Sequence, residues 1–90
     1  MEKAEIYRKL TSIFNEIFDE ESIVVRPDLT AHDVDEWDSL NHIRLILTAE
    51  KEFQVRFSAS EIGKLQNVGE FVELIRRKQA EAERRLVYGS

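Results

Sequence analysis

The chain has 90 residues, which is enough for one domain with a thin hydrophobic core. It contains no cysteine, so a disulfide, a cysteine nucleophile and a thiolate metal site are excluded. No apolar run approaches the roughly 18 residues that a membrane span needs, and the first residues lack the apolar core of a secretory signal. We therefore expect a cytoplasmic protein that has no membrane partner.

The net charge of −5 is concentrated in one part of the chain. Between residues 19 and 38 the only Lys or Arg residue is Arg26. An acidic band repels phosphate backbones, which argues against nucleic acid as a partner, and it favours proteins that present a basic surface. The acidic residues of the band are Asp19, Glu20, Glu21, Asp28, Asp33, Asp35, Glu36 and Asp38.

The first predicted element is an amphipathic helix over about residues 2–19. Its apolar residues recur at intervals of three and four, which is the helical period. They are Ile6, Leu10, Ile13 and Ile17, with Tyr7, Phe14 and Phe18 widening the stripe.

Residues 20–38 do not show a helical pattern. Ser22 to Val25 is a short, mostly β-branched run, and Pro27 ends any local helix. Apolar residues recur through the segment, so we expect a long loop that packs onto the core. These residues are Ile23, Val25, Leu29, Val34 and Trp37.

A second helix is predicted to begin at Ser39, with Asp38 as its N-cap, and to end near Phe53. We expect its buried stripe to consist of Leu40, Ile43, Ile46, Leu47 and Phe53.

Two further helices follow. Ser58 and Glu61 have the spacing of a capping box, which opens a short helix that ends near Gly63. Asn67 caps a fourth helix, which runs on toward Glu83, and residues 87–90 are expected to fray. Its buried face should hold Val68, Phe71, Val72 and Ile75.

The predicted fold class is all-α. It is a four-helix bundle of three longer helices and one short one, with a long loop between the first two. Residues 1–79 should form the domain, and residues 80–90 a helical extension or a frayed C-terminal tail.

Ser39 is the candidate for chemistry. A helix N-terminus favours anions, so a phosphate ester on this hydroxyl would lie in a favourable field. The neighbouring Asp38 opposes it electrostatically, which makes sense if a metal-dependent modifying enzyme uses that carboxylate. Taken alone, a serine after an aspartate at a helix start is most often a plain cap.

The segment from Glu36 to Ile46 resembles the phosphopantetheine attachment segment of acyl carrier proteins. The similarity covers about residues 3–78. It continues through the segments 50–53, 55–57, 61–62, 65–68 and 71–75. The resemblance implies that the expected four-helix bundle is of the acyl-carrier type. It also implies that residues 1–79 form an acyl-carrier domain.

The resemblance implies a carrier, not an enzyme. A phosphopantetheinyl transferase would attach 4′-phosphopantetheine from coenzyme A to Ser39, with Asp38 supporting the modification. The arm would hold an acyl or aminoacyl group as a thioester, and the chain would be a monomeric phosphoprotein of fatty-acid or polyketide biosynthesis. An acyl-loading ligase or acyltransferase and downstream acyl-processing enzymes would be its partners.

The expected second helix departs from the family pattern, in which this helix is usually acidic. It carries His42, Arg44 and Lys51, which favours a dedicated set of partners over housekeeping fatty-acid synthesis. The candidate partner contacts are Trp37, Leu40, His42, Ile43 and Arg44. If the helices pack as in the family, the residues that could surround an acyl chain are Ile43, Leu47, Ile62, Leu65 and Phe71, which otherwise form core. Their bulk gives a weak preference for short or polar cargo.

Several alternatives are weighed against this interpretation. His32 and His42 lack metal-ligand spacing, and a hydrolase built on Ser39 and His42 would lack the Gly-x-Ser-x-Gly motif. His42 is more readily interpreted as an exposed contact residue. A calcium loop beginning at Asp33 and Asp35 would have Asp38 where glycine is needed and Arg44 where glutamate is needed. No metal site is therefore predicted.

Three further alternatives stay open. Trp37 is either a docking residue or a packing residue that fixes the approach to Ser39. The basic residues between 76 and 85 are either a solvated helix face or a contact surface. The alternative function is a helical protein-interaction module without a prosthetic group.

Overall fold

The computed structural model describes residues 2–18, 23–34 and 37–88. These ranges contain α1 (Lys3–Phe18), the 3-10 turn η1 (Ala31–Asp33), α2 (Ser39–Phe53), α3 (Ala59–Gly63) and α4 (Val68–Tyr88), and no strand. The predicted all-α class, with three longer helices and one short helix, is confirmed. Val87 and Tyr88, which we expected to fray, belong to α4. Five acids of the predicted band, Asp19, Glu20, Glu21, Asp35 and Glu36, lie outside the described residues, as do Ser22, Gly89 and Ser90.

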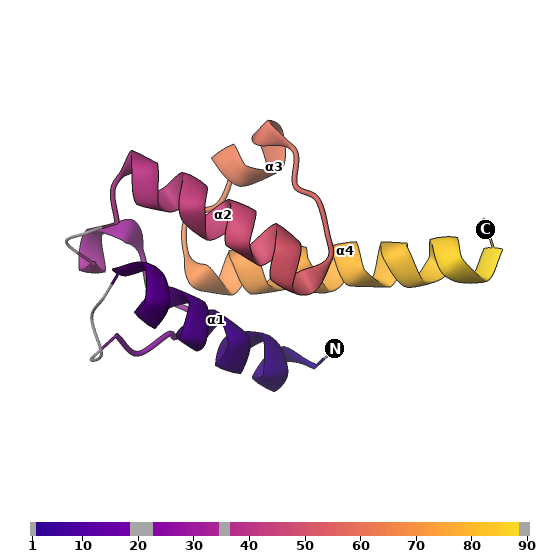
Figure 1. The fold of residues 1–90 in the computed structure, drawn as a ribbon, viewed down its shortest axis with the longest axis horizontal. Helices are drawn as coiled ribbons and strands as arrows, with labels where there is room; N and C mark the ends of the chain where they lie inside the picture. The colour runs from indigo at the N-terminus through magenta and orange to yellow at the C-terminus, as the bar shows by residue number, and fades with distance from the viewer. Residues whose placement is uncertain (1, 19–22, 35–36, 89–90) are drawn as a thin grey trace.

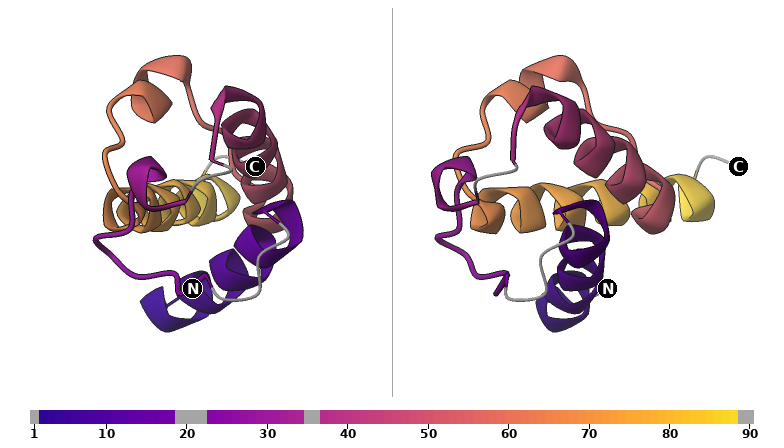
Figure 2. Two further views of the ribbon diagram at one scale, coloured as in Figure 1. Left: turned by 90° about the vertical axis from the view of Figure 1, so that its left-hand side faces the viewer. Right: turned by 60° about the vertical axis from the view of Figure 1, so that its left-hand side comes forward.

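The helices are arranged around α4 (Figure 1). α1 packs against both α2 and α4; it runs in the opposite direction to α2 and crosses α4 at a steep angle (Figures 1 and 2). α3 lies on the side of α2 away from α1, and the C-terminal half of α4 projects beyond the other helices (Figures 1 and 2). Among the described residues, no helix combines the length and the apolar character that crossing a membrane requires.

The core is built from one face of each long helix and from the loop between α1 and α2. The stripe predicted for α1 is confirmed, except that Ile17 and Tyr7 are only half-buried. The loop also packs inward, as expected, through Ile23, Leu29 and Val34. From α4 the core receives Val68, Phe71, Val72 and Ile75, as predicted.

The buried stripe predicted for α2 is wrong in part. Leu40, Ile43 and Leu47 are 66%, 56% and 59% exposed, and Leu45, which we had not placed in the core, is 1% exposed. The reason is that this helix carries apolar residues on two faces, and periodicity alone cannot decide which face meets the core. The stripe that is buried consists of Leu45, Ile46, Ala49 and Phe53.

The loop is tied directly to the start of α4. The N–H of Val68 donates to the carbonyl of Leu29 at 2.9 Å, and the N–H of Gly69 donates to the carbonyl of Pro27 at 2.9 Å. A Cβ on residue 69 would lie 3.1 Å from the Pro27 oxygen and 3.2 Å from its Cβ, so the close approach favours glycine there. Loop carbonyls therefore satisfy N–H groups that the first turn of a helix otherwise leaves unpaired.

The neighbouring leucines of α2 provide a test of its orientation. We expect Leu45→Ala to lower the free energy of unfolding by about 2–5 kcal/mol, since it removes buried methyl groups and leaves a cavity. Leu47→Ala is the matched control and should change it by about 0.5 kcal/mol or less, as exposed substitutions do. Equilibrium urea denaturation measures both, and equal losses would contradict the orientation described here.

Candidate functional site

Ser39 is the first residue of α2 and its side chain is exposed. Asp38 is the N-cap, as predicted: its backbone is extended and its carboxylate Oδ1 accepts a hydrogen bond from the N–H of Asn41 at 2.9 Å. The Asp38 carbonyl also accepts from the N–H of His42 at 2.8 Å. Since Asp38 performs the capping, the Ser39 hydroxyl is not needed for it.

Trp37 holds the approach to Ser39 in place. Its ring meets Phe14 edge to face, with centroids 5.2 Å apart, and lies 5.8 Å from the ring of Phe18. Its indole N–H donates to Nδ1 of His42 at 3.0 Å. Trp37 is half-buried and packed on the core, which is the packing role weighed above.

His42 is half-buried, which corrects its expected place as an exposed contact residue. A neutral imidazole has one ring nitrogen that accepts and one that donates. Because Nδ1 accepts from Trp37, the hydrogen bond assigns the proton to Nε2. No lone pair is left to take a proton from Ser39, so the arrangement does not provide the base that a serine hydrolase needs.

Two hollows lie next to this site. A shallow one of about 380 Å³ is lined by Ala31, Trp37, Asp38, Ser39 and His42. An inner one of about 80 Å³ lies behind it and is mostly apolar. Its lining consists of Ala31, Trp37, His42, Leu45, Ile46, Leu65, Gln66, Asn67, Val68 and Phe71.

The residues expected to surround an acyl chain are only partly brought together. Leu65 and Phe71 line the inner hollow. Ile62 is half-buried against the core, whereas Ile43 and Leu47 are mostly exposed on the other face of α2 and do not line this hollow. Sequence reasoning missed Leu45 and Val68 as lining residues. Leu45 lies four residues before Ala49, a spacing that places both on one face of the helix. That spacing indicates burial only once the face that meets the core is known.

The exposed face of α2 next to Ser39 is mostly apolar and carries Arg44. Leu40, Ile43 and Leu47 form a stripe that begins beside the serine. Arg44 is exposed beside the stripe, and its Nη1 donates to Oδ1 of Asn41 at 3.3 Å. Three of the residues predicted as partner contacts, Leu40, Ile43 and Arg44, are therefore accessible.

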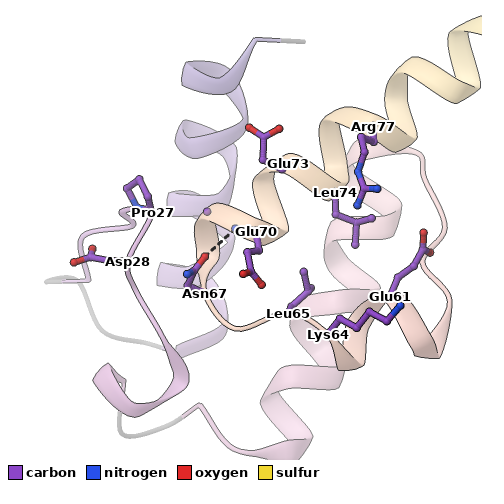
Figure 3. A pocket seen from close by; sticks show the side chains of 11 residues that line it. Pro27, Asp28, Glu61, Lys64, Leu65, Asn67, Glu70, Glu73, Leu74 and Arg77 are labelled. Atoms are coloured by element: carbon purple, nitrogen blue, oxygen red, sulfur yellow. Dashed lines mark hydrogen bonds between the residues drawn. The ribbon is translucent and has the colours of Figure 1, made fainter.

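A larger hollow of about 740 Å³ lies elsewhere, between the loop, α3 and α4 (Figure 3). Its lining mixes acidic and basic side chains with Leu65 and Leu74, and no residue of α2 contributes to it. The Asn67 carboxamide, at one edge, accepts from the N–H of Glu70 at 2.9 Å, which confirms Asn67 as the cap (Figure 3). This hollow is not part of the Ser39 site.

Glu61, at the edge of this hollow, fastens α3 to α4. Its carboxylate accepts from the N–H of Ser58 at 2.8 Å, and Ser58 Oγ accepts from the N–H of Glu61 at 3.1 Å, so the predicted capping box is present. Lys78 Nζ on α4 lies 2.9 Å from the same carboxylate. The hydrogen bond from Ser58 and the pairing with Lys78 lower the pKa of Glu61 from its ordinary 4.5 to about 2.

Asp33, the first ligand position of the calcium hypothesis, is engaged within its own turn. Its carboxylate accepts from the N–H of Thr30 at 3.0 Å, and Arg26 Nη2 lies 3.8 Å away. These contacts, the Thr30 N–H first, lower the pKa of Asp33. Asp35 lies outside the described residues. Within the part of the chain that the structure describes, no three His, Cys, Asp or Glu side chains gather where they could hold a metal ion.

The structure is similar to two solved acyl carrier proteins. The holo acyl carrier protein of Geobacter metallireducens has 38% sequence identity and a TM-score of 0.80, over 93% of this chain and 93% of that chain. The acyl carrier protein of Thermotoga maritima has 26% identity and a TM-score of 0.78, over 91% of this chain and 95% of that chain. No family model and no curated protein sequence matches the chain.

The low pKa of Glu61 predicts how stability depends on pH. A carboxylate whose pKa is lower in the folded state stabilises that state above its unfolded pKa. For Glu61 this contribution is lost as the pH falls from 4.5 toward about 2. The wild-type protein should therefore have a higher free energy of unfolding than Glu61→Gln. The difference should be largest at neutral pH and should shrink as the pH falls from 4.5 toward about 2.

Urea denaturation at a series of pH values measures this difference. Lys78→Met is the companion variant, because it removes the ammonium but keeps the hydrogen bonds with Ser58. It should lose only part of the pH dependence. A gap between wild type and Glu61→Gln that stayed constant down to low pH would contradict the prediction.

Proposed function

This chain belongs to the acyl carrier protein family, and we propose that it carries acyl or aminoacyl groups as thioesters on a 4′-phosphopantetheine arm attached to Ser39. The observation that carries the proposal is the position of Ser39: an exposed hydroxyl on the first residue of α2, beside an accessible apolar stripe. The similar protein of Geobacter metallireducens is described as a holo form, which supports the presence of a prosthetic group.

The residues around Ser39 fit a bulky phosphate ester. The hydroxyl lies at the surface, where a phosphopantetheinyl transferase can reach it, and it borders the open hollow of about 380 Å³. The first turn of α2 presents backbone N–H groups and the positive end of the helix dipole, both of which favour a phosphate. When bound, the arm supplies the thiol that this cysteine-free chain lacks.

Asp38 has two roles in the proposal. Its Oδ1 fixes the first turn of α2 by accepting from Asn41, so it determines where the Ser39 hydroxyl is presented. Its negative charge would repel a phosphate ester on its neighbour. We propose that the charge is kept because the transferase, working with a divalent cation, uses this carboxylate during attachment.

The partners are proposed to be a transferase, an acyl-loading ligase or acyltransferase, and enzymes that process the acyl group. They would bind the face formed by Leu40, Ile43, Leu47 and Arg44, next to the attachment point. Because Arg44 is exposed on this face, a partner that places a basic surface against it is disfavoured. This supports a specialised pathway over housekeeping fatty-acid synthesis.

Attachment at Ser39 has a direct test. Incubation with coenzyme A and a promiscuous phosphopantetheinyl transferase should raise the intact mass by one phosphopantetheine group. Ser39→Ala should show no gain, and Ser60→Ala, which removes another exposed serine at a helix start, should be modified like the wild type. A folded wild-type chain that no transferase modifies would leave the alternative, an interaction module without a prosthetic group.

Asp38→Asn separates the two roles of the aspartate. Asparagine caps helices about as well as aspartate, so stability should change by no more than about 0.5 kcal/mol. The rate of modification should nevertheless fall by about tenfold or more, since the carboxylate charge is lost. An unchanged rate would show that Asp38 serves only as a cap.

Arg44→Glu tests the proposed choice of partners. The loaded wild-type carrier should be elongated slowly by a ketosynthase of housekeeping fatty-acid synthesis, and Arg44→Glu should raise kcat/KM by about three- to tenfold by improving charge complementarity. Lys51→Glu, which makes the same charge change at the far end of α2, is the control and should have little effect. Efficient elongation of the wild type would contradict the proposed specialisation.

A further inference from the structure

The hollow at Ser39 and the inner hollow have a common wall. Ala31, Trp37 and His42 line both of them, whereas Asp38 and Ser39 line only the outer one and the core residues only the inner one. Of the three shared residues, Trp37 and His42 carry large rings, and these rings are joined by the indole N–H to Nδ1 hydrogen bond of 3.0 Å.

The wall is held from both of its ends. On the Trp37 side, the ring rests against Phe14 and Phe18, both of which have no exposed surface. On the other side, His42 is fixed by its place in the first turn of α2, where its N–H donates to the Asp38 carbonyl. The two rings lie within 28° of parallel, with centroids 6.1 Å apart. A chain passing directly from the Ser39 hollow into the inner one would have to pass this pair.

The inner hollow is small. Its volume of about 80 Å³ is little more than half the roughly 150 Å³ of an apolar cavity that holds benzene. Its lining includes Leu45, Val68 and Phe71, which are 1%, 1% and 5% exposed, and also the exposed residues Ala31 and Gln66, so it is a mostly apolar hollow that extends from the core to the surface. It has room for only the end of a short chain while the wall stays in place.

We propose that the hydrogen-bonded Trp37–His42 pair is a barrier between the attachment site and the core, and that it keeps cargo of more than a few carbons outside the bundle. The inference rests on the proposed attachment at Ser39 and adds to it the two residues that set the size of cargo this carrier can shelter. In this role Trp37 and His42 are specificity-determining residues. They hold the passage shut through their contact with each other.

The first experiment uses the unmodified chain and does not depend on the attachment. Benzene is titrated into the wild type, His42→Ala, Trp37→Phe and His32→Ala, and the methyl NMR signals of Leu45, Ile46 and Val68 are followed. We expect saturable shifts in His42→Ala and none in the wild type or in His32→Ala, whose histidine is exposed and lines neither hollow. Trp37→Phe keeps an aromatic ring beside Phe14 but loses the N–H, and should also show shifts.

The second experiment loads the modified chains with acetyl or octanoyl groups and measures the rate of thioester hydrolysis. In the wild type and His32→Ala the two rates should agree within about twofold, since both cargoes stay in solvent. In His42→Ala the octanoyl thioester should hydrolyse about fivefold or more slowly, and the same methyl signals should shift.

Two results would overturn the barrier. One is a wild type that already takes benzene or protects the octanoyl thioester. The other is the absence of any change in both folded variants, His42→Ala and Trp37→Phe. Failure of the attachment itself shows as an unmodified Ser39, and the benzene experiment still decides whether the pair closes the core.

Discussion

The placement of Ser39 depends on the contacts of Trp37. A long loop separates α1 from α2, and a loop of that length does not by itself fix where the next helix starts. The indole ring rests on Phe14 and Phe18 of α1, and its N–H is bonded to His42 in the first turn of α2. Asp38 and Ser39 lie between these two anchors, so the cap and the hydroxyl are held at a defined point on the surface.

The same loop is fixed at a second place, where the carbonyls of Pro27 and Leu29 accept from the first N–H groups of α4. The loop therefore joins three helices: α1 through Trp37, α2 through Asp38 and α4 through these carbonyls. The attachment proposed for Ser39 needs a constant position relative to the face proposed to bind partners. The backbone hydrogen bonds of the loop with α4 and the packing of the Trp37 ring on α1 fix this position, even though the core of the chain is thin.

Features that depend on local chemistry were predicted well from the sequence. Asp38, Ser58 and Asn67 cap their helices as expected, because a cap involves residues only three positions apart. The α1 stripe was also correct apart from the half-buried Tyr7 and Ile17, since that helix has a single apolar face. Burial along α2 was mispredicted, because Leu45 and Leu47 both belong to helical rows of apolar residues. Only the packing of the other helices decides that Leu45 is buried and Leu47 is exposed.

The site was predicted in the same uneven way. Ser39 at an exposed helix start follows from its neighbours in the chain. The inner hollow instead depends on how α2 and α4 are placed together, so Ile43 and Leu47, which we grouped with its lining residues Leu65 and Phe71, are exposed. The bond between Trp37 and His42 could not be read from the sequence, because an indole N–H has many partners within reach until the fold selects one.

The two apolar faces of α2 have a consequence for how this helix is oriented about its own axis. A turn about that axis would exchange the stripe of Leu45, Ile46, Ala49 and Phe53 for that of Leu40, Ile43 and Leu47, and both stripes contain large aliphatic side chains. Hydrophobicity alone therefore distinguishes the two orientations poorly. The bond from Trp37 to His42 exists in only one of them, so a polar contact selects the rotational register, as single polar residues do in coiled coils.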